Sequence, residues 1–576
     1  MLALTALCLL TFWHVPSFDF VFYDDPVYVS ENASLADGLT LAAVRYAFTT
    51  NEANLWHPIT WLSHGLDIQL FGRENASGHH AVNLAIHLAN TLLFLILGHR
   101  IAARWKSPSP IGVGLIAAAL FCVHPLHVET VAWISDRKGL LSTLFSLIAL
   151  VAYLRPGRST MWRMVTLACF VLAIMAKPSS VILPGIFVAL DATVRRKVGF
   201  EESLPDPLAL FRKQFVDKWL FGLLSIGAAA MAILFQSGGS HDFFKVSLAT
   251  RLTSLPARLG FYAHRTIWPS DLNFSYSFPS GHYFTIYSVI GLILLVIGAL
   301  LAVNLWRRKP WFTLAWAWAI LAFLPVSGIS TVGASFTTDR YTYFLHGGLF
   351  LWVAFELIRF KASLKPLMGR LVGVGVLGVV ALLAGLSHLQ ANHWRESESL
   401  FLNSTISRPS EPIGFTNLGT LYDREGRIEE AIVYYKKGLA LKPSEYIAHY
   451  NLGTIYRDQG NTDAAADSYR DALDIYPDYP PALLSLAQIL MGRYNTPASA
   501  ESLDEAVDLL TRSASSARLN RPLYLNTLVE AFILKNDFPS ATQALREALA
   551  SPTNNPELRN ELERKRAEFQ AAGIWK

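Results

Sequence analysis

The sequence predicts an all-α protein, in which a polytopic bundle of membrane helices precedes a solenoid of helical repeats. Hydrophobic residues make up 52% of the 576 residues and charged residues only 16%, against about a quarter in ordinary soluble proteins. The last third of the chain is polar and repeats a pattern of residues at a fixed period. Basic residues lie in short clusters rather than in a long stripe, so no nucleic-acid partner is expected.

The apolar runs predict the membrane helices, since a span needs roughly 20 mostly apolar residues and the chain offers about eleven such runs. They lie near residues 1–16, 81–99, 111–125, 139–154, 162–176, 178–192, 219–236, 284–305, 311–328, 342–358 and 371–389. The segment 252–269 is also apolar, but Pro256 interrupts it and three cationic or imidazole side chains lie within it. We interpret it as an interfacial or re-entrant helix.

Clusters of Lys and Arg occur in every second loop, which orients the bundle by the positive-inside rule. An odd number of spans with a cytoplasmic N-terminus places the loop 17–80 and the polar part after residue 390 on the extracytoplasmic face. We expect a bacterial inner-membrane protein with periplasmic repeats. In a eukaryote the same arrangement predicts the endoplasmic reticulum membrane with lumenal repeats.

The polar part repeats every 34 residues, because Asn417-Leu418-Gly419 recurs as Asn451-Leu452-Gly453 and several Tyr, Gly, Ala and Pro positions follow at the same spacing. This period and pattern resemble the tetratricopeptide repeat. The expected domains are a membrane domain, a linker, about four repeats and a capping helix, over residues 1–390, 391–411, 412–556 and 557–576. Such arrays hold extended polypeptides or partner domains, and the alternative is that this one only rigidifies the protein.

The first outer loop contains two adjacent carboxylates, Asp24 and Asp25, a few residues beyond the first apolar run. Carboxylates at the membrane surface suit a general base or a metal ligand acting on a lipid-borne substrate. The alternative is that Asp24 caps a helix begun by Pro26.

Further ionisable and aromatic residues fall on the outer face in this topology, where their burial is costly and indicates function. The candidates for binding the donor phosphate or substrate are His57, Arg137, Lys177, Arg340 and Tyr341. His124, His127 and Glu129 are candidate metal ligands on one turn, although such histidines more often form hydrogen bonds. The sequence identifies no cofactor, and a divalent metal stays an open alternative.

Together the Asp pair, Trp-His-Pro-Ile-Thr-Trp (56–61), His-Pro-Leu-His-Val-Glu-Thr (124–130), Asp-Arg-Tyr-Thr-Tyr (339–343) and the repeats resemble the transmembrane and tetratricopeptide-repeat-containing proteins. This family is related to the protein O-mannosyltransferases of glycosyltransferase fold C. The resemblance implies transfer of a hexose, mannose by analogy, from a polyprenyl phosphate to Ser or Thr hydroxyls of a protein.

The resemblance also implies roles for individual residues: Asp24 is the base and Asp25 its partner. Arg340, Arg137 and Lys177 lie on the phosphate side, and His57 orients a substrate. Two other functions are consistent with the sequence, namely a non-catalytic membrane scaffold that recruits partners through its repeats, and transfer to a glycan or lipid. The repeats favour a polypeptide acceptor.

Overall fold

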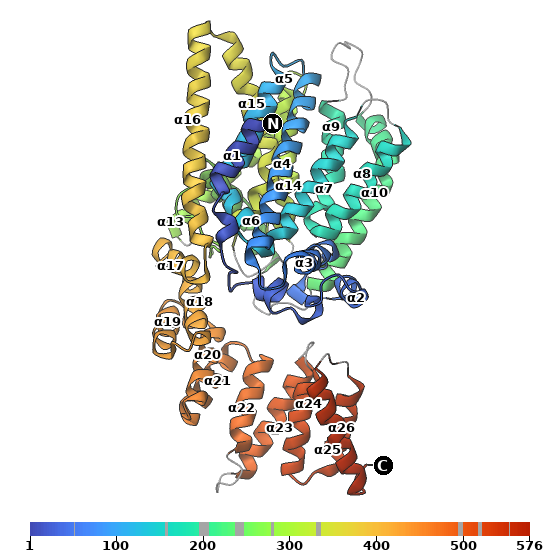
Figure 1. The fold of residues 1–576 in the computed structure, drawn as a ribbon, viewed down its shortest axis with the longest axis vertical. Coiled ribbons are helices and arrows are strands. Elements are labelled where there is room, and N and C mark those ends of the chain that lie inside the picture. Colours follow the sequence, from blue (N-terminus) through green and yellow to red (C-terminus); the bar gives the residue numbers. More distant parts are fainter. Residues whose placement is uncertain are drawn as a thin grey trace. The chain divides into compact units, whose positions relative to one another are not determined.

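The computed structural model describes residues 1–50, 52–155, 159–194, 207–236, 247–277, 281–329, 336–492, 499–516, 521–551, 553 and 555–575 (Figure 1). In this part of the chain the elements are helices, apart from one isolated antiparallel bridge between Tyr276 and Thr337. The all-α class is therefore confirmed. Two compact units are present, Met1–Ser407 and Arg408–Lys576.

The first unit holds the apolar helices together with the first outer loop. Its helices are α1 (Leu2–Phe12), α2 (Leu41–Thr49), α3 (Pro58–Phe71), α4 (Ala76–Arg104), α5 (Pro110–Val123), α6 (Val128–Ala132), α7 (Arg137–Tyr153), α8 (Thr160–Ala176), α9 (Leu183–Thr193), α10 (Pro207–Gln236), α12 (Leu248–Ile267), α13 (Gly281–Leu305), α14 (Pro310–Phe323), α15 (Thr342–Ser363), α16 (Pro366–Ala391) and α17 (Ser397–Ser407). Figure 1 shows α2 and α3 at one end of the long helices of this unit.

Five helical segments are long and apolar enough to cross a membrane: Ala76–Arg104, Lys218–Phe235, Phe284–Leu305, Asp339–Ser363 and Pro366–Trp394. The pair α5 and α6, bent by 60° around Pro125, gives a sixth if it is one broken span. Other expected runs form shorter apolar helices, so eleven spans are not confirmed. The helices are nevertheless consistent with an integral membrane protein.

The segment predicted as interfacial forms α12, which is not among the helices of spanning character. It packs against α13 with the two backbones in contact. A Cβ atom added at Gly260 would lie 2.0 Å from the Tyr287 carbonyl oxygen, and one at Gly291 would lie 1.8 Å from that of Pro256. Only glycine at both positions permits this approach.

We expect a reporter fused after Asn392 to be extracytoplasmic and one fused after Arg308 to be cytoplasmic, because basic loops stay in the cytoplasm. The helix α16 is the last one of spanning length before Asn392. Periplasmic alkaline phosphatase and cytoplasmic fluorescent-protein fusions measure the two positions. A cytoplasmic signal at Asn392 would contradict the predicted orientation and separate the repeats from the first outer loop.

The second unit consists of successive antiparallel helices (Figure 1). They are α18 (Pro412–Arg424), α19 (Ile428–Leu441), α20 (Tyr446–Asp458), α21 (Thr462–Ile475), α22 (Pro480–Gly492), α23 (Ser499–Ser516), α24 (Arg521–Leu534), α25 (Phe538–Ala550) and α26 (Pro556–Ala571). The last of these lies where the sequence predicts a capping helix. The segment expected to be a linker contains α17, which belongs to the first unit.

The repeat pattern has a clear physical basis in this unit. A Cβ atom at Gly419 would lie 2.7 Å from the Tyr435 ring, and one at Gly453 would lie 2.7 Å from the Tyr469 ring, so each glycine admits the buried tyrosine of its own helix pair. The amide of Asn451 donates to the Tyr435 hydroxyl over 3.0 Å. This bond joins one repeat to the next.

Replacing Gly453 with Trp is expected to unfold the array around α20 and α21, because the indole has no space beside Tyr469. Overpacking should lower the free energy of unfolding by about 1–3 kcal/mol or more. Limited proteolysis of the full chain should then cut near α20, whereas the same substitution at exposed Gln459 should leave the array resistant. Equal protease resistance of both variants would contradict the packing described.

Candidate functional site

Asp25 is fully buried and connects the first outer loop to the segment before α7. One carboxylate oxygen accepts hydrogen bonds from the Ser135 backbone N–H, over 3.0 Å, and from the Ser135 hydroxyl. The other accepts from the Val21 N–H over 2.9 Å. Burial raises the pKa of Asp25 to about 6, while these donors act in the opposite direction. Asp25 is therefore engaged inside the protein and holds the loop in place.

Asp24 differs from its neighbour because its side chain is only partly buried. The residues around Tyr23 show where it lies. Desolvation and then the negative charge of Asp24 raise the pKa of Tyr23, whereas the charge of Arg340 lowers it and that of Glu129 raises it. The Tyr23 ring lies 5.5 Å from the Trp133 ring, and the Arg340 guanidinium carbon lies 5.1 Å from the centroid of the same Trp133 ring. The accessible carboxylate and the predicted phosphate-side cation border the same region.

Arg340 and Glu129 form an ion pair across 211 residues of sequence. The Arg340 guanidinium donates to one Glu129 oxygen, and the Arg340 backbone N–H donates to the other over 2.8 Å. The Glu129 side chain is 2% exposed, whereas that of Arg340 is 17% exposed. Glu129 therefore fixes the Arg340 guanidinium, which remains partly accessible to solvent or substrate.

Lys177 and Arg340 lie near the same ring, that of Tyr341. The Lys177 ammonium is 5.9 Å and the Arg340 guanidinium carbon 5.4 Å from its centroid. Lys177 also lies 3.3 Å from a carboxylate oxygen of buried Asp136 and is 17% exposed. Three residues predicted from sequence to bind the donor are thus close together, although they come from two distant segments.

Arg137, by contrast, is buried, and its side chain is bound by other groups of the protein. Its guanidinium donates to the side-chain oxygen of Asn83, to the hydroxyl of Ser63 over 2.9 Å and to the carbonyl of His79 over 2.9 Å. It also pairs with Asp67, with a nitrogen to oxygen distance of 2.8 Å. Because Arg137 is fully buried and all three of its nitrogens donate, we assign it as a positioning residue.

His57 lies at the start of α3, stacked on Trp61 at 5.0 Å between ring centroids. Burial, together with the charges of Lys138 and Lys177, lowers the pKa of His57 well below its ordinary value. A hydrogen bond of 3.0 Å from the Thr60 hydroxyl to the Ala176 carbonyl ties α3 to the residue before Lys177. His57 therefore borders the cations as a neutral imidazole.

The sequence analysis missed Lys138, which is buried beside the Asp pair. Its ammonium donates to the Tyr28 hydroxyl over 3.1 Å and to the Ser135 carbonyl over 3.0 Å, and it lies 4.4 Å from the Tyr28 ring centroid. The position of Lys138 directly after Arg137, at the end of a polar segment, could have indicated a second cation at the site.

The predicted metal ligands are not brought together. Glu129 pairs with Arg340, while His124 Nε2 donates to the Thr266 carbonyl over 3.0 Å and His127 contacts His346 over 3.0 Å. These histidines form hydrogen bonds, which was the alternative weighed from sequence.

Two other groups of potential ligand atoms lie within 4.8 Å of one another in the described part of the chain: Cys8, His87 and Cys122, and His64, Asp67 and His79. Both ring nitrogens of His87 are already engaged, by the Tyr343 hydroxyl and the Cys122 carbonyl. In the second group a dication would share the single carboxylate of Asp67 with Arg137. Charge balance favours the existing ion pair.

A family model for the tetratricopeptide repeat matches residues 382–445 and 416–480. A protein O-mannosyl-transferase of Caenorhabditis elegans is 24% identical over 403 residues, which are 68% of this chain and 54% of that protein. The protein O-mannosyl-transferase TMTC4 of Mus musculus is 23% identical over 437 residues, 66% of this chain and 57% of that protein.

The chain is similar to protein O-mannosyl-transferases. The resemblance inferred from the motifs is therefore confirmed, and so is the presence of tetratricopeptide repeats. The chain spans about half the length of the curated relatives it matches. The crystal structure of yeast Tom70 aligns over 85% of this chain and 96% of that chain, at 12% identity and a TM-score of 0.27. This TM-score is too low to support an argument.

Replacing Arg137 with Met is expected to destabilise the protein by about 3–5 kcal/mol, because Asp67 would be left buried without its cation. Thermal unfolding of the detergent-purified full chain measures this loss. Arg45→Met, at an exposed arginine of the first outer loop, is the matched control and should change little. The double variant Arg137→Met/Asp67→Leu should recover part of the stability, and a single variant as stable as the control would contradict the positioning role.

Proposed function

We propose that the chain is a membrane glycosyltransferase that moves a hexose, by similarity mannose, from a polyprenyl phosphate to Ser or Thr hydroxyls of proteins on the extracytoplasmic face. The observation that carries the proposal is that Arg340 and Tyr23, the neighbour of Asp24, both lie against the Trp133 ring. A partly exposed carboxylate and an accessible cation at one place are the two groups that this reaction requires. The similarity to protein O-mannosyl-transferases supports the same reaction class.

In the proposed reaction the acceptor hydroxyl gives its proton to Asp24 while its oxygen forms a bond to the anomeric carbon of the sugar. The bond from that carbon to the phosphate oxygen breaks, and the electron pair stays on the lipid phosphate. Arg340 and Lys177, which both lie within 6 Å of the Tyr341 ring centroid, at 5.4 and 5.9 Å, stabilise the additional negative charge on the phosphate. Asp25 keeps the loop and therefore Asp24 in position through Ser135.

The repeats supply the acceptor in this proposal. Stacked tetratricopeptide units bind extended segments of polypeptide, and a polypeptide with accessible hydroxyl side chains is an acceptor of the required chemistry. Relatives that are named protein O-mannosyl-transferases support a protein acceptor over a glycan or lipid.

Replacing Asp24 with Asn is expected to lower transfer by about 10²–10⁴-fold, because general base assistance contributes this much and the amide cannot accept the proton. Donor binding should persist. The assay follows label from a polyprenyl-phosphate sugar into a protein acceptor, with donor affinity measured separately. Asp37→Asn, at an exposed carboxylate of the same outer loop, is the matched control. Full activity of the folded Asp24→Asn variant would overturn the base assignment, and absence of transfer by the wild-type chain in the same assay would favour the non-catalytic scaffold.

Arg340→Ala is expected to weaken donor binding by about 10- to 100-fold, the worth of a charge-assisted hydrogen bond to phosphate. It also leaves Glu129 buried without its cation. The double variant Arg340→Ala/Glu129→Gln removes that unpaired charge, so it separates loss of folding from loss of donor binding. Wild-type donor affinity in the double variant would contradict a phosphate-binding role.

A further inference from the structure

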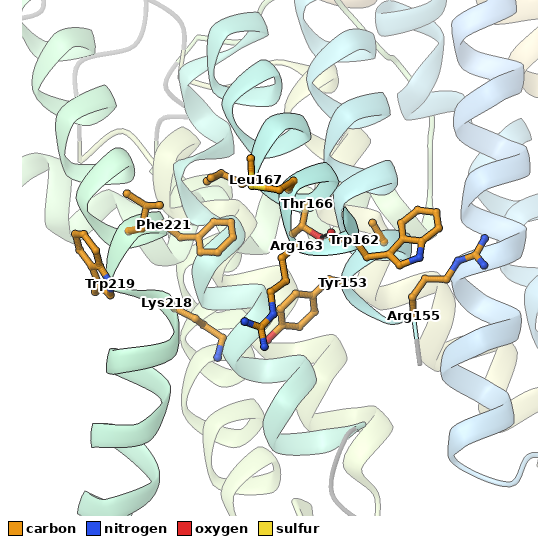
Figure 2. Close-up of a pocket in the computed structure, with 12 residues that line it drawn as sticks. Tyr153, Arg155, Trp162, Arg163, Thr166, Leu167, Lys218, Trp219 and Phe221 are labelled. Carbon is orange, nitrogen blue, oxygen red and sulfur yellow. Dashed lines mark hydrogen bonds between the residues drawn. The ribbon is translucent and has the colours of Figure 1, made fainter. Parts of the chain in front are cut away.

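A cavity of about 300 Å³ lies between the end of α7, the first turns of α8 and the middle of α10 (Figure 2). Its wall combines apolar side chains, such as Leu167 and Phe221, with aromatic and cationic ones. In Figure 2 the Arg163 and Lys218 side chains point to the same region beside Tyr153. The cavity thus has an apolar side and a charged side.

The surrounding helices place this cavity at a membrane boundary. The candidate span Lys218–Phe235 begins with a residue of the cavity wall, and only 6% of its apolar window is buried inside the protein, so it faces lipid. Trp219, next to Lys218, is 57% exposed. Tryptophan beside a cation at the end of a span is typical of the headgroup region.

The cavity and the candidate catalytic residues lie at opposite ends of one helix. α7 begins at Arg137, within the polar network described above, and ends at Tyr153, which lines the cavity. Its 17 residues separate the two places by about 25 Å, close to the thickness of the hydrocarbon core. The cavity is therefore at the opposite end of α7 from the proposed chemistry, at the end that the alternation of basic loops predicts to be cytoplasmic.

The charged side of the cavity is strongly basic. Asp191 is shared by Lys218, at 2.8 Å, and by the Tyr153 hydroxyl, at 2.7 Å, so one acid is already matched by one base. Among the described residues, no carboxylate lies within ion-pair distance of Arg155 or Arg163. Arg155 lies over the Trp162 ring, with 4.4 Å between the guanidinium carbon and the ring centroid. Figure 2 shows the Arg155 guanidinium on the far side of Trp162 from Arg163, so Arg163, beside Lys218, is the guanidinium that faces an anion in the cavity.

Two further arginines add positive charge behind the same helix end. Arg100 donates to the Val151 carbonyl over 2.7 Å, and Arg104 donates to the Leu154 carbonyl. Both therefore satisfy the last carbonyls of α7 and raise the local positive potential. A basic pocket between membrane helices on the basic face attracts anionic headgroups.

We propose that this cavity binds an anionic phospholipid of the surrounding bilayer, with the phosphate at Arg163 on the side that also holds Lys218 and the upper acyl chains along Leu167 and Phe221 (Figure 2). The volume fits a headgroup and its first methylenes, and the exposed side of α10 carries the rest of the chain in the bilayer. Charge complementarity selects an anionic headgroup such as phosphatidylglycerol over a zwitterionic one. The site holds a structural lipid and takes no part in sugar transfer.

The test uses the delipidated full chain in neutral detergent, with phosphatidylglycerol or phosphatidylcholine added and bound lipid counted by native mass spectrometry. Phosphatidylglycerol should be retained preferentially. Arg163→Gln should weaken its binding by about fivefold, the effect of one near-surface charge, and Arg155→Gln should weaken it less because Arg155 lies on the far side of Trp162 (Figure 2). Arg155→Lys/Arg163→Lys should keep most of the affinity. Arg307→Gln is the matched control, since Arg307 is exposed and also lies near a tryptophan, Trp306, at 5.8 Å.

Equal retention of the two phospholipids, or equal loss of phosphatidylglycerol in the Arg307 control, would overturn the proposal. Tighter binding of undecaprenyl phosphate or free inorganic phosphate than of phosphatidylglycerol, each added in a separate series, would also overturn the proposal if that binding depends on the same arginines. Because Arg155 and Arg163 are exposed, their substitution is not expected to prevent folding. Unchanged thermal unfolding in the absence of lipid checks this point.

Discussion

The buried guanidinium of Arg137 joins the first outer loop to the membrane helices. It reaches α3 through Asp67 and Ser63, and α4 through Asn83 and the His79 carbonyl, while it belongs itself to the first turn of α7. Burying a cation costs several kcal/mol unless charge and hydrogen bonds compensate it. These partners therefore compensate the buried charge and hold α3, α4 and α7 together at this end of the bundle.

The segment just before Arg137 is held by the same hydrogen-bond network and connects it to the first outer loop. Asn83, which accepts from Arg137, also donates to the Trp133 carbonyl over 3.0 Å. Two residues later Ser135 binds the carboxylate of Asp25. The loop carrying Asp24 is therefore tethered to the same framework. A flexible sixty-residue loop would hold a catalytic carboxylate poorly, whereas this one is fixed by buried polar contacts.

Features that depend on a local sequence pattern could be predicted, whereas contacts between residues far apart in the sequence could not. The repeats were predictable because one pattern, Gly419 against Tyr435, returns as Gly453 against Tyr469. The Asp pair could be found, but two adjacent carboxylates do not reveal which one is buried. The contact between Glu129 and Arg340 joins residues 211 positions apart, so no spacing rule predicts it. Arg137 resembled the phosphate-side cations for the same reason, since only packing shows that its donors are used.

The direct contact between the backbones of α12 and α13 restricts how this region can move. Helices separated by interlocking side chains slide past one another by small rotamer changes. Here Gly260 and Gly291 bring main chain against main chain, so sliding would drive carbonyl oxygens into the opposite backbone. The two helices must therefore travel as one rigid body. Any widening of the membrane bundle on this side has to come from hinges in the segments that flank the pair.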